Sequence, residues 1–473
     1  MKIVESAQPE TQAALEWLNV VRKIEQRSTD TGDKIAGATR APQGSGYNRH
    51  SRGRSPMKLR LAALLVLVFT CLGAQQKGPE HWVATWTTAQ LLSQTVAPQP
   101  AAARPADVRS FNNQTVRMIV RTSIGGHRLR VNLSNAFGSQ PLAVGAAHIA
   151  IRAKGSEIVA GSDRALSFNG KPGCTVGPGM VILSDPVDLT VAPLQDLAVS
   201  LYFPGQTGPP TAHTIGLHPT YIKEGDVTGQ AALPDAATTQ SYFWLEGIDV
   251  AAPAAAALIV ALGDSITDGH FSTPDTDHSW PALLAARLAA QKATANIAVV
   301  NMGIGGNRVL RDVTGASALA RFDRDVLSQP GVKWVMVLEG INDIGHGSLT
   351  PAEMVTAEEL IAGHKQIIER AHTHGLKAIG CTLTPFEGAY YARENGEAVR
   401  EALNTWIRTS GAYDAVVDFD AATDDPNNPK RFRADLDPGD HLHPNDAGYQ
   451  AMANAVDLAI FGGQRAASKP AQR

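Results

Sequence analysis

The chain has 473 residues, of which 44% are hydrophobic and 18% are charged. This composition is typical of a globular protein and too apolar for a disordered one, and the length allows two or three domains. The formal net charge of −3, from 42 basic and 45 acidic residues, excludes an overall basic field for binding nucleic acid. The 3 cysteines lack paired spacing, which excludes a disulfide-stapled scaffold and a cysteine-rich zinc module.

A basic stretch followed by a short apolar run lies near the N-terminus. Lys58 and Arg60 precede residues 61–72, which are apolar apart from one threonine. This order is typical of a secretory signal, and the run is shorter than the roughly 20 residues that a membrane span needs. We therefore expect residues 1–56 to be a disordered upstream extension and residues 57–73 to be a signal peptide, which makes the mature protein secreted or periplasmic. The alternative is a genuine N-terminal tail with an internal apolar segment.

Apolar and polar residues alternate with a period of two from about residue 80 to residue 250. In one of these segments the side chains predicted to face the core are Leu129, Val131 and Leu133. We expect Arg128 and Arg130, on the opposite face, to be solvated, with a ligand surface as the alternative.

The same region contains a turn signal and no long amphipathic helical pattern. Gly125-Gly126 separates the alternating segments 115–123 and 127–134 and predicts a hairpin turn between them. Residues 80–250 are therefore predicted to form an antiparallel β-sandwich or jelly-roll-like accessory domain. A short alanine-rich connector follows at residues 251–257.

The pattern changes after the connector to apolar runs separated by helical stretches. The runs predicted as buried strands are residues 258–262, 297–302, 334–338, 377–383 and 415–419. The stretches predicted as helices are residues 280–291, 352–374, 399–409 and 446–460. This alternation indicates an α/β domain at residues 256–463, with a parallel sheet covered on both faces and a disordered tail at 464–473. Functional residues in such folds collect at the carboxyl ends of the strands.

The first strand of this domain ends in Gly263-Asp264-Ser265. A serine on a tight turn between a strand and a helix has an exposed hydroxyl, and the free N–H groups at the helix start can stabilise an oxyanion. Ser265 is therefore a candidate nucleophile. The alternative for so short a motif is an N-capping serine.

The second and third strands end in turns that offer further oxyanion donors. Gly306 could bring a bare backbone N–H close to a ligand oxygen, and the alternative is a plain turn glycine with positive φ. Asn342 could supply a side-chain amide, with Asp343 orienting it from behind. The alternative for Asn342-Asp343 is an Asx-turn.

Asp440 and His443 lie shortly before the last predicted helix. A general base for serine is a near-neutral histidine whose far nitrogen is held by a carboxylate, and this pair can meet that need on one turn. His441 is expected to be a solvated loop residue, because one histidine is enough.

Metal binding is the alternative use of these side chains. The metallo-hydrolase pattern H-x-H-x-D-H fails here, because Asn445 stands in place of Asp and Asp446 in place of the last His. No other cluster in the sequence completes a site with His441, so we expect neither a metal nor another cofactor.

In combination, the four motifs resemble the SGNH, or GDSL, hydrolase family over about residues 258–461. The resemblance implies a three-layer αβα flavodoxin-like domain in which Ser265 is the nucleophile and Asp440 and His443 complete a catalytic triad. The sequence segments at residues 129–135 and 382–386 resemble those of a bacterial secreted branch of the family, the esterases encoded beside xylanases. In that branch a β domain precedes the catalytic domain.

The resemblance also implies how the site binds the reacting group. An oxyanion hole would be formed by Ser265, Gly306 and Asn342, with Asp264 and Asp343 supporting the site from behind. These are the residue types that the family pattern requires at each position.

The function implied is that of an exported serine esterase acting on short acyl esters through an acyl-enzyme intermediate, without a cofactor. Small-molecule or polysaccharide esters are the expected partners, with O-acetyl groups on carbohydrate favoured; nucleic acid and a membrane span in the mature form are not expected. One alternative is a lysophospholipase or thioesterase, which needs an apolar acyl channel. Another is a carbohydrate-binding protein with an inactive hydrolase domain, against which the intact set of site residues argues.

Overall fold

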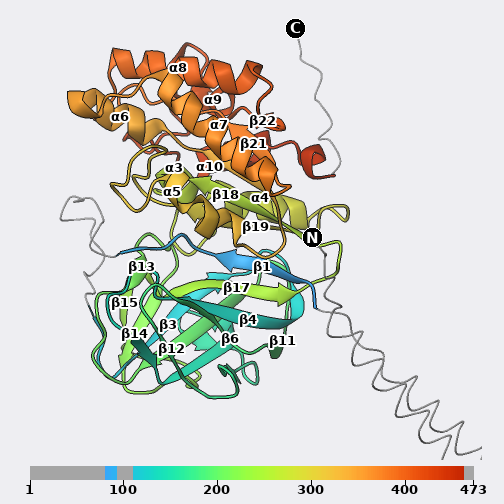
Figure 1. The fold of residues 1–473 in the computed structure, drawn as a ribbon. Coiled ribbons are helices and arrows are strands. Elements are labelled where there is room, and N and C mark those ends of the chain that lie inside the picture. The colour runs from blue at the N-terminus through green and yellow to red at the C-terminus, as the bar shows by residue number, and fades with distance from the viewer. Residues whose placement is uncertain (1–79, 93–109, 463–473) are drawn as a thin grey trace, which may run out of the picture. The chain divides into compact units, whose positions relative to one another are not determined.

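The computed structural model describes residues 80–92 and 110–462 (Figure 1). The extension, signal peptide and tail predicted at residues 1–56, 57–73 and 464–473 lie outside the described residues. The domain limits at residues 250 and 256 stay predictions. No helix in the described part of the chain is long and apolar enough to cross a membrane.

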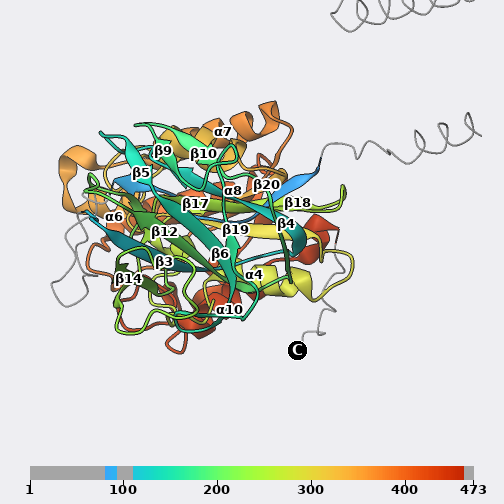
Figure 2. The same ribbon diagram turned by 90° about the horizontal axis from the view of Figure 1, so that it is seen from below.

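The first half of the described chain consists of antiparallel β-sheets. One sheet contains β1 (Trp82–Thr87), β17 (Leu245–Ala251), β4 (Gly126–Ser134), β10 (Val181–Leu183) and β11 (Val187–Val191). The second contains β15 (Ala237–Thr239), β14 (Thr220–Glu224), β3 (Gln114–Arg121), β12 (Asp196–Phe203), β6 (Ala146–Lys154), β7 (Glu157–Ile158) and β8 (Arg164–Ala165). A third, small sheet contains β2 (Leu91–Leu92), β13 (Thr211–His213) and β16 (Tyr242–Phe243). A two-stranded sheet pairs β5 (Leu142–Val144) with β9 (Cys174–Val176). Figure 2 shows β3, β12 and β6 running alongside one another.

The alternating pattern identified the buried face of β4 but not the environment of its other face. Leu129, Val131 and Leu133 are fully buried, as predicted. Arg128 and Arg130, which were predicted to be solvated, are only partly exposed, at 32% and 20% of their side-chain surface, and both are paired with acids. Arg130 Nε donates to Asp249 at 2.8 Å and its guanidinium lies 4.6 Å from the centroid of a Trp82 ring, while Arg128 pairs with Glu80 and Asp188. The reason is that β17 places Asp249 directly opposite Arg130 across the sheet.

The predicted hairpin at Gly125-Gly126 is also wrong. The strands on either side of it lie in different sheets, because β3 pairs with β12 and β14 whereas β4 pairs with β17, β10 and β11. Residues 122–125 therefore carry the chain from one sheet to the other. Alternation shows which side of a strand is buried, but it does not identify the neighbouring strand.

The second half contains a five-stranded parallel sheet in the order β19-β18-β20-β21-β22. Its strands are β18 (Ala257–Gly263), β19 (Ile297–Gly303), β20 (Val332–Leu338), β21 (Lys377–Cys381) and β22 (Ala415–Val417), which confirms the predicted strands. Numbered along the chain, this order is 2-1-3-4-5, the flavodoxin-like order. The jelly-roll connections of the β region and the covering of both faces of this sheet stay predictions.

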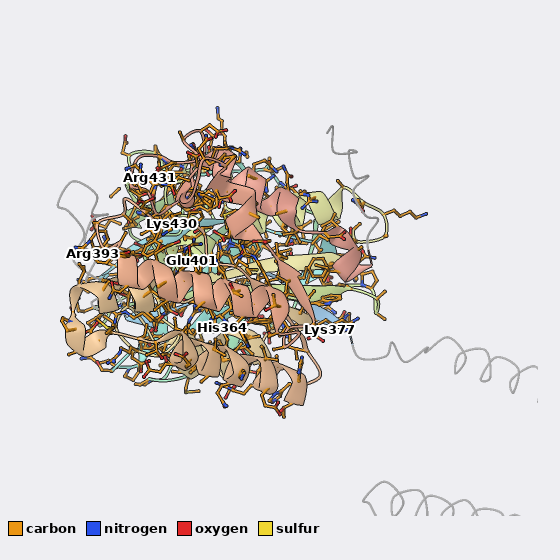
Figure 3. All side chains as sticks on the ribbon, turned by 90° about the horizontal axis from the view of Figure 1, so that it is seen from above. His364, Lys377, Arg393, Glu401, Lys430 and Arg431 are labelled. Carbon is orange, nitrogen blue, oxygen red and sulfur yellow. The ribbon has the colours of Figure 1, made fainter. Side chains whose placement is uncertain are left out.

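The helices of this half follow the strands. They are α3 (Ser265–Asp268), α4 (Trp280–Ala289), α5 (Ala318–Phe322), α6 (Ile341–Leu349), α7 (Ala357–Thr373), α8 (Glu394–Thr409), α9 (Phe419–Thr423) and α10 (Asp446–Ala455). Shorter elements are η3 (Asp323–Leu327), η4 (Pro351–Glu353), η5 (Leu458–Phe461), β23 (Asp424–Asp425) and β24 (Asn428–Phe432). Figure 3 shows α7 and α8 side by side, with His364 of α7 labelled; its ring centroid lies 6.3 Å from that of Trp406 on α8.

Helix α6 was not predicted, because its sequence is rich in Gly, Asn, Asp and His, which favour turns. Burial of Ile341 and Ile344 stabilises it despite these weak propensities. Asn342 and Asp343 consequently lie in the first turn of a helix and not in an isolated Asx-turn.

Candidate active site

Ser265 is the first residue of helix α3, which is separated from strand β18 by Asp264 alone. Asp264 caps this helix, since its Oδ1 accepts the Ile266 N–H at 2.9 Å. The N–H of a first helical residue has no partner within the helix and is free for a ligand. A Cβ on Gly303, at the end of β19, would lie 2.2 Å from the backbone nitrogen of Asp268, so glycine is required for the strand to approach α3 this closely.

Ser265, His443 and Asp440 form a hydrogen-bonded chain. His443 Nε2 lies 2.8 Å from Ser265 Oγ, and His443 Nδ1 lies 2.6 Å from Asp440 Oδ2. Asp440 Oδ1 accepts the backbone N–H groups of Leu442 and His443. Burial alone would raise the pKa of Asp440, but the hydrogen bonds and charge of His443 outweigh it and lower that pKa. The carboxylate therefore stays ionised and can hold an imidazolium.

The other two oxyanion donors predicted from the sequence, Gly306 and Asn342, lie on two neighbouring segments. Gly306 has a φ of +78°, which glycine adopts readily, in the turn after β19. Asn342 Nδ2 donates to the carbonyl of Asn307 at 3.1 Å, and its Oδ1 accepts the Tyr391 hydroxyl at 3.3 Å. A side-chain amide has two N–H groups, so one remains to point at a substrate oxygen. Tyr391, in the loop after β21, was not predicted, because no periodic pattern marks that loop.

Asp343 does not orient Asn342 as predicted. Its carboxylate accepts the backbone N–H groups of Val309 and Leu310, at 2.8 and 3.1 Å. It thus anchors the segment that follows Gly306. Burial raises its pKa to about 6.

A fully buried arginine that the sequence analysis missed lies beneath these loops. Arg321 donates to the carbonyls of Gly263 and Met302, to Asn307 Oδ1, and to the carboxylates of Asp325 and Glu339. It therefore ties the ends of β18 and β19 to the oxyanion loop. A single arginine among the apolar residues of α5 was the signal available in the sequence.

Two buried acids accompany Arg321. Burial raises the pKa of Asp264 to about 7, and burial next to Asp264 raises that of Glu339 well above its ordinary value. Within the described residues, Asp264 Oδ2 and Glu339 Oε2 have no hydrogen-bond partner. Protonation of such carboxyls removes the cost of burying their charge.

The side chains considered above as possible metal ligands do not form one cluster. Each of them contacts a different neighbour. His441 Nδ1 lies 2.5 Å from Asp437, and the His441 side chain is half exposed. Asp446 accepts from Thr273 and lies 2.9 Å from His278 Nδ1. Across residues 80–92 and 110–462 no group of three or more His, Cys, Asp or Glu residues could hold a metal ion.

This arrangement has the parts needed for acyl transfer. A hydroxyl is hydrogen-bonded to an imidazole, the imidazole to an ionised carboxylate, and backbone and amide N–H groups lie nearby to accept a developing negative charge.

Comparison with known proteins agrees with this chemistry. Residues 261–451 match the model of the GDSL-like lipase/acylhydrolase family. An alpha/beta hydrolase enzyme from the metagenome of Lake Arreo, Spain, is 26% identical, with 44% of this chain and 96% of that chain covered and a TM-score of 0.34. An acetyl xylan esterase from Geobacillus stearothermophilus is 25% identical, with 45% and 97% covered and a TM-score of 0.34. No curated protein matches the chain. The chain thus carries a GDSL-like lipase/acylhydrolase domain at residues 261–451 and is a GDSL-type serine ester hydrolase.

Proposed function

We propose that this protein hydrolyses short-chain acyl esters, with O-acetyl groups on carbohydrate as the substrate class, and that Ser265 carries the acyl group. The observation that carries the proposal is the chain from Ser265 Oγ to His443 Nε2 at 2.8 Å and from His443 Nδ1 to Asp440 at 2.6 Å. This is the hydrogen-bonding pattern that activates a serine for attack on a carbonyl.

In the first half-reaction Ser265 Oγ bonds to the ester carbonyl carbon while its proton passes to His443 Nε2. The oxyanion is held by the Ser265 and Gly306 N–H groups and the free amide N–H of Asn342. The C–O bond then breaks, and the alcohol leaves with the proton from His443. In the second half-reaction water gives its proton to His443 and attacks the acyl-enzyme, which releases the acid and restores Ser265.

A short acyl group is supported by the sequence, which has no long apolar insertion that could build an acyl tunnel. The resemblance of the sequence to xylanase-associated esterases supports acetylated polysaccharide as the natural ester, and the signal-like run at residues 61–72 supports export.

The test is Ser265→Ala, assayed on p-nitrophenyl acetate and acetylated xylan. We expect turnover to fall by about 10⁴-fold or more while circular dichroism is unchanged. A fluorophosphonate should label the wild type at Ser265 and leave the variant unlabelled. Ser410→Ala, at an exposed serine after α8, is the matched control and should retain full activity. Retention of several per cent of the turnover by Ser265→Ala would exclude this serine as the nucleophile.

A further inference from the structure

The loop that follows α3 places two aromatic rings against the catalytic histidine. The ring centroid of His270 lies 4.6 Å from that of His443, and the ring centroid of Phe271 lies 5.6 Å from it. Phe271 is 51% exposed and has a φ of +67°. An exposed phenylalanine in the left-handed region is held in an unfavourable conformation, so the surrounding structure must stabilise it.

Strands and loops of the β region hold this loop through two aspartates. Asp275 accepts from both terminal nitrogens of Arg152 at 2.6 Å and lies 2.8 Å from His218. Asp277 lies 2.9 Å from the other ring nitrogen of His218 and accepts from Arg121 at 2.8 Å. Each nitrogen of His218 thus faces a carboxylate, and the pKa of His218 is raised to about 9 by these carboxylates despite burial. These contacts of Asp275 and Asp277 with the β region, here called the clamp, fix the loop on this side.

Helix α10 holds the same loop at a second point. Asp446 accepts the backbone N–H and the hydroxyl of Thr273, at 2.8 and 2.7 Å, and lies 2.9 Å from His278 Nδ1. The position of Phe271 is therefore determined from two directions.

The reaction requires the leaving alcohol of the ester to bind near His443, and therefore near Phe271. His443 Nε2 gives its proton to the alcohol that leaves, so the alcohol oxygen must lie within hydrogen-bond reach of that nitrogen. An alcohol held there lies within reach of Phe271, whose ring centroid is 5.6 Å from that of His443. Burial, followed by the charge of His443, lowers the pKa of His270 to about 4, so this ring is neutral and does not repel the imidazolium that forms.

We propose that Phe271 is the binding surface for the alcohol part of the ester, that this part is a sugar or aryl ring, and that the β region sets this preference by clamping the loop at residues 269–279. The inference rests on the esterase function proposed above. The exposed aromatic face packs against the face of an aryl ring or the C–H groups of a sugar ring but offers little to a short alkyl alcohol.

The test compares three esters that share the acetyl group: p-nitrophenyl acetate, an acetylated xylo-oligosaccharide and ethyl acetate. Phe271→Ala should lower kcat/KM by about three- to tenfold on the two ring esters, the factor expected for the loss of one aromatic contact. On ethyl acetate the change should stay below about twofold. Phe271→Tyr keeps the ring and should behave as the wild type on all three esters. An equal loss on all three, or no loss on any, would overturn the assignment of Phe271.

The clamp is tested separately with the double variant Asp275→Asn, Asp277→Asn. Asparagine tolerates the positive φ of both positions while the charge is lost. The variant should reproduce the selective loss on the ring esters, with an unchanged rate on ethyl acetate as the control for folding. An unchanged preference would show that the clamp does not set specificity. If the wild type hydrolyses none of the three acetates, the proposed function itself fails, an outcome distinct from an unselective effect of Phe271→Ala.

Discussion

Replacing Arg321 with methionine tests whether the buried cation holds the active-site loops together. The side chain is fully buried, and its guanidinium donates to the carbonyls of Gly263 and Met302 and to Asn307, which in turn accepts from Asn342. Methionine is unbranched and apolar and can fill much of the volume, so the change removes hydrogen bonds and charge more than packing.

The magnitude follows from the groups left behind. Asp325 keeps its contacts to Arg324, whereas no other described side chain donates to Glu339 Oε1. The two carbonyls and the Asn307 oxygen also lose a buried donor, and each unsatisfied group costs about 1–3 kcal/mol. Arg321 also forms a buried ion pair with Asp325, and removing one partner of such a pair costs about 3–5 kcal/mol, which we take as the expected loss in the free energy of unfolding. That loss is a large part of the roughly 5–15 kcal/mol typical of folded domains.

Urea unfolding followed by tryptophan fluorescence measures this loss, and turnover of p-nitrophenyl acetate measures the effect on the oxyanion loop. We expect Arg321→Met to unfold at clearly lower urea and, where it is still folded, to turn over substrate more slowly. Arg433→Met removes an exposed arginine paired with Asp435 and should change neither measurement. A loss of stability below about 1 kcal/mol for Arg321→Met would refute the reasoning that these acceptors need the cation.

Three further predictions address the site. His443→Ala should be as inactive as Ser265→Ala, because His443 contacts the serine hydroxyl. His441→Ala should lower turnover by about tenfold or less, because His441 pairs with Asp437. The reverse ranking would contradict the triad. On p-nitrophenyl esters kcat/KM should peak at acetate or butyrate and fall by octanoate. Burying each methylene of the acyl chain contributes about 0.8 kcal/mol of binding free energy only until the pocket is full. A peak at ten carbons or more would favour a lipid substrate. Burial raises the pKa of Asp264 to about 7 in the folded chain, so the folded state binds its proton more tightly than the unfolded state does. The wild type should therefore lose stability relative to Asp264→Asn as the pH rises from about 4 to 7, and a constant difference between their urea curves would contradict this pKa.

The parts of the fold that local sequence determines were predictable. Buried parallel strands need continuous apolar runs, and all five strands of the α/β sheet are where such runs occur. The candidate site was predictable for a related reason, since the carboxyl ends of neighbouring parallel strands meet at one edge of the sheet. The structure brings Ser265, at the end of β18, into hydrogen-bond contact with His443, 178 residues away.

The parts that depend on long-range pairing were not predictable from local patterns. The alternation in β3 and β4 showed their buried faces but suggested a hairpin, whereas their partners are distant strands. Arg130 was expected in solvent because the strand alone does not reveal that Asp249 lies opposite. Tyr391 reaches the site from a loop whose local sequence carries no sign of that contact, and for Arg321 the sequence offered only a single arginine among the apolar residues of α5.

Helix α3 shows why the Gly-Asp-Ser motif by itself does not determine the site. A helix of four residues is too short to be stable alone, so its position depends on contacts at both ends. Asp264 caps its first turn, and at its last residue Asp268 lies 2.9 Å from His213 Nε2, a side chain of the β region. Burial alone would lower the pKa of His213, but the charge of Asp268 and hydrogen bonds to Asp268 and backbone carbonyls raise it, and the buried contact between His213 and Asp268 holds this end of the helix. The β region thus contributes directly to the position of the helix that carries Ser265. It also holds the loop that carries Phe271, through the contacts of Asp275 and Asp277.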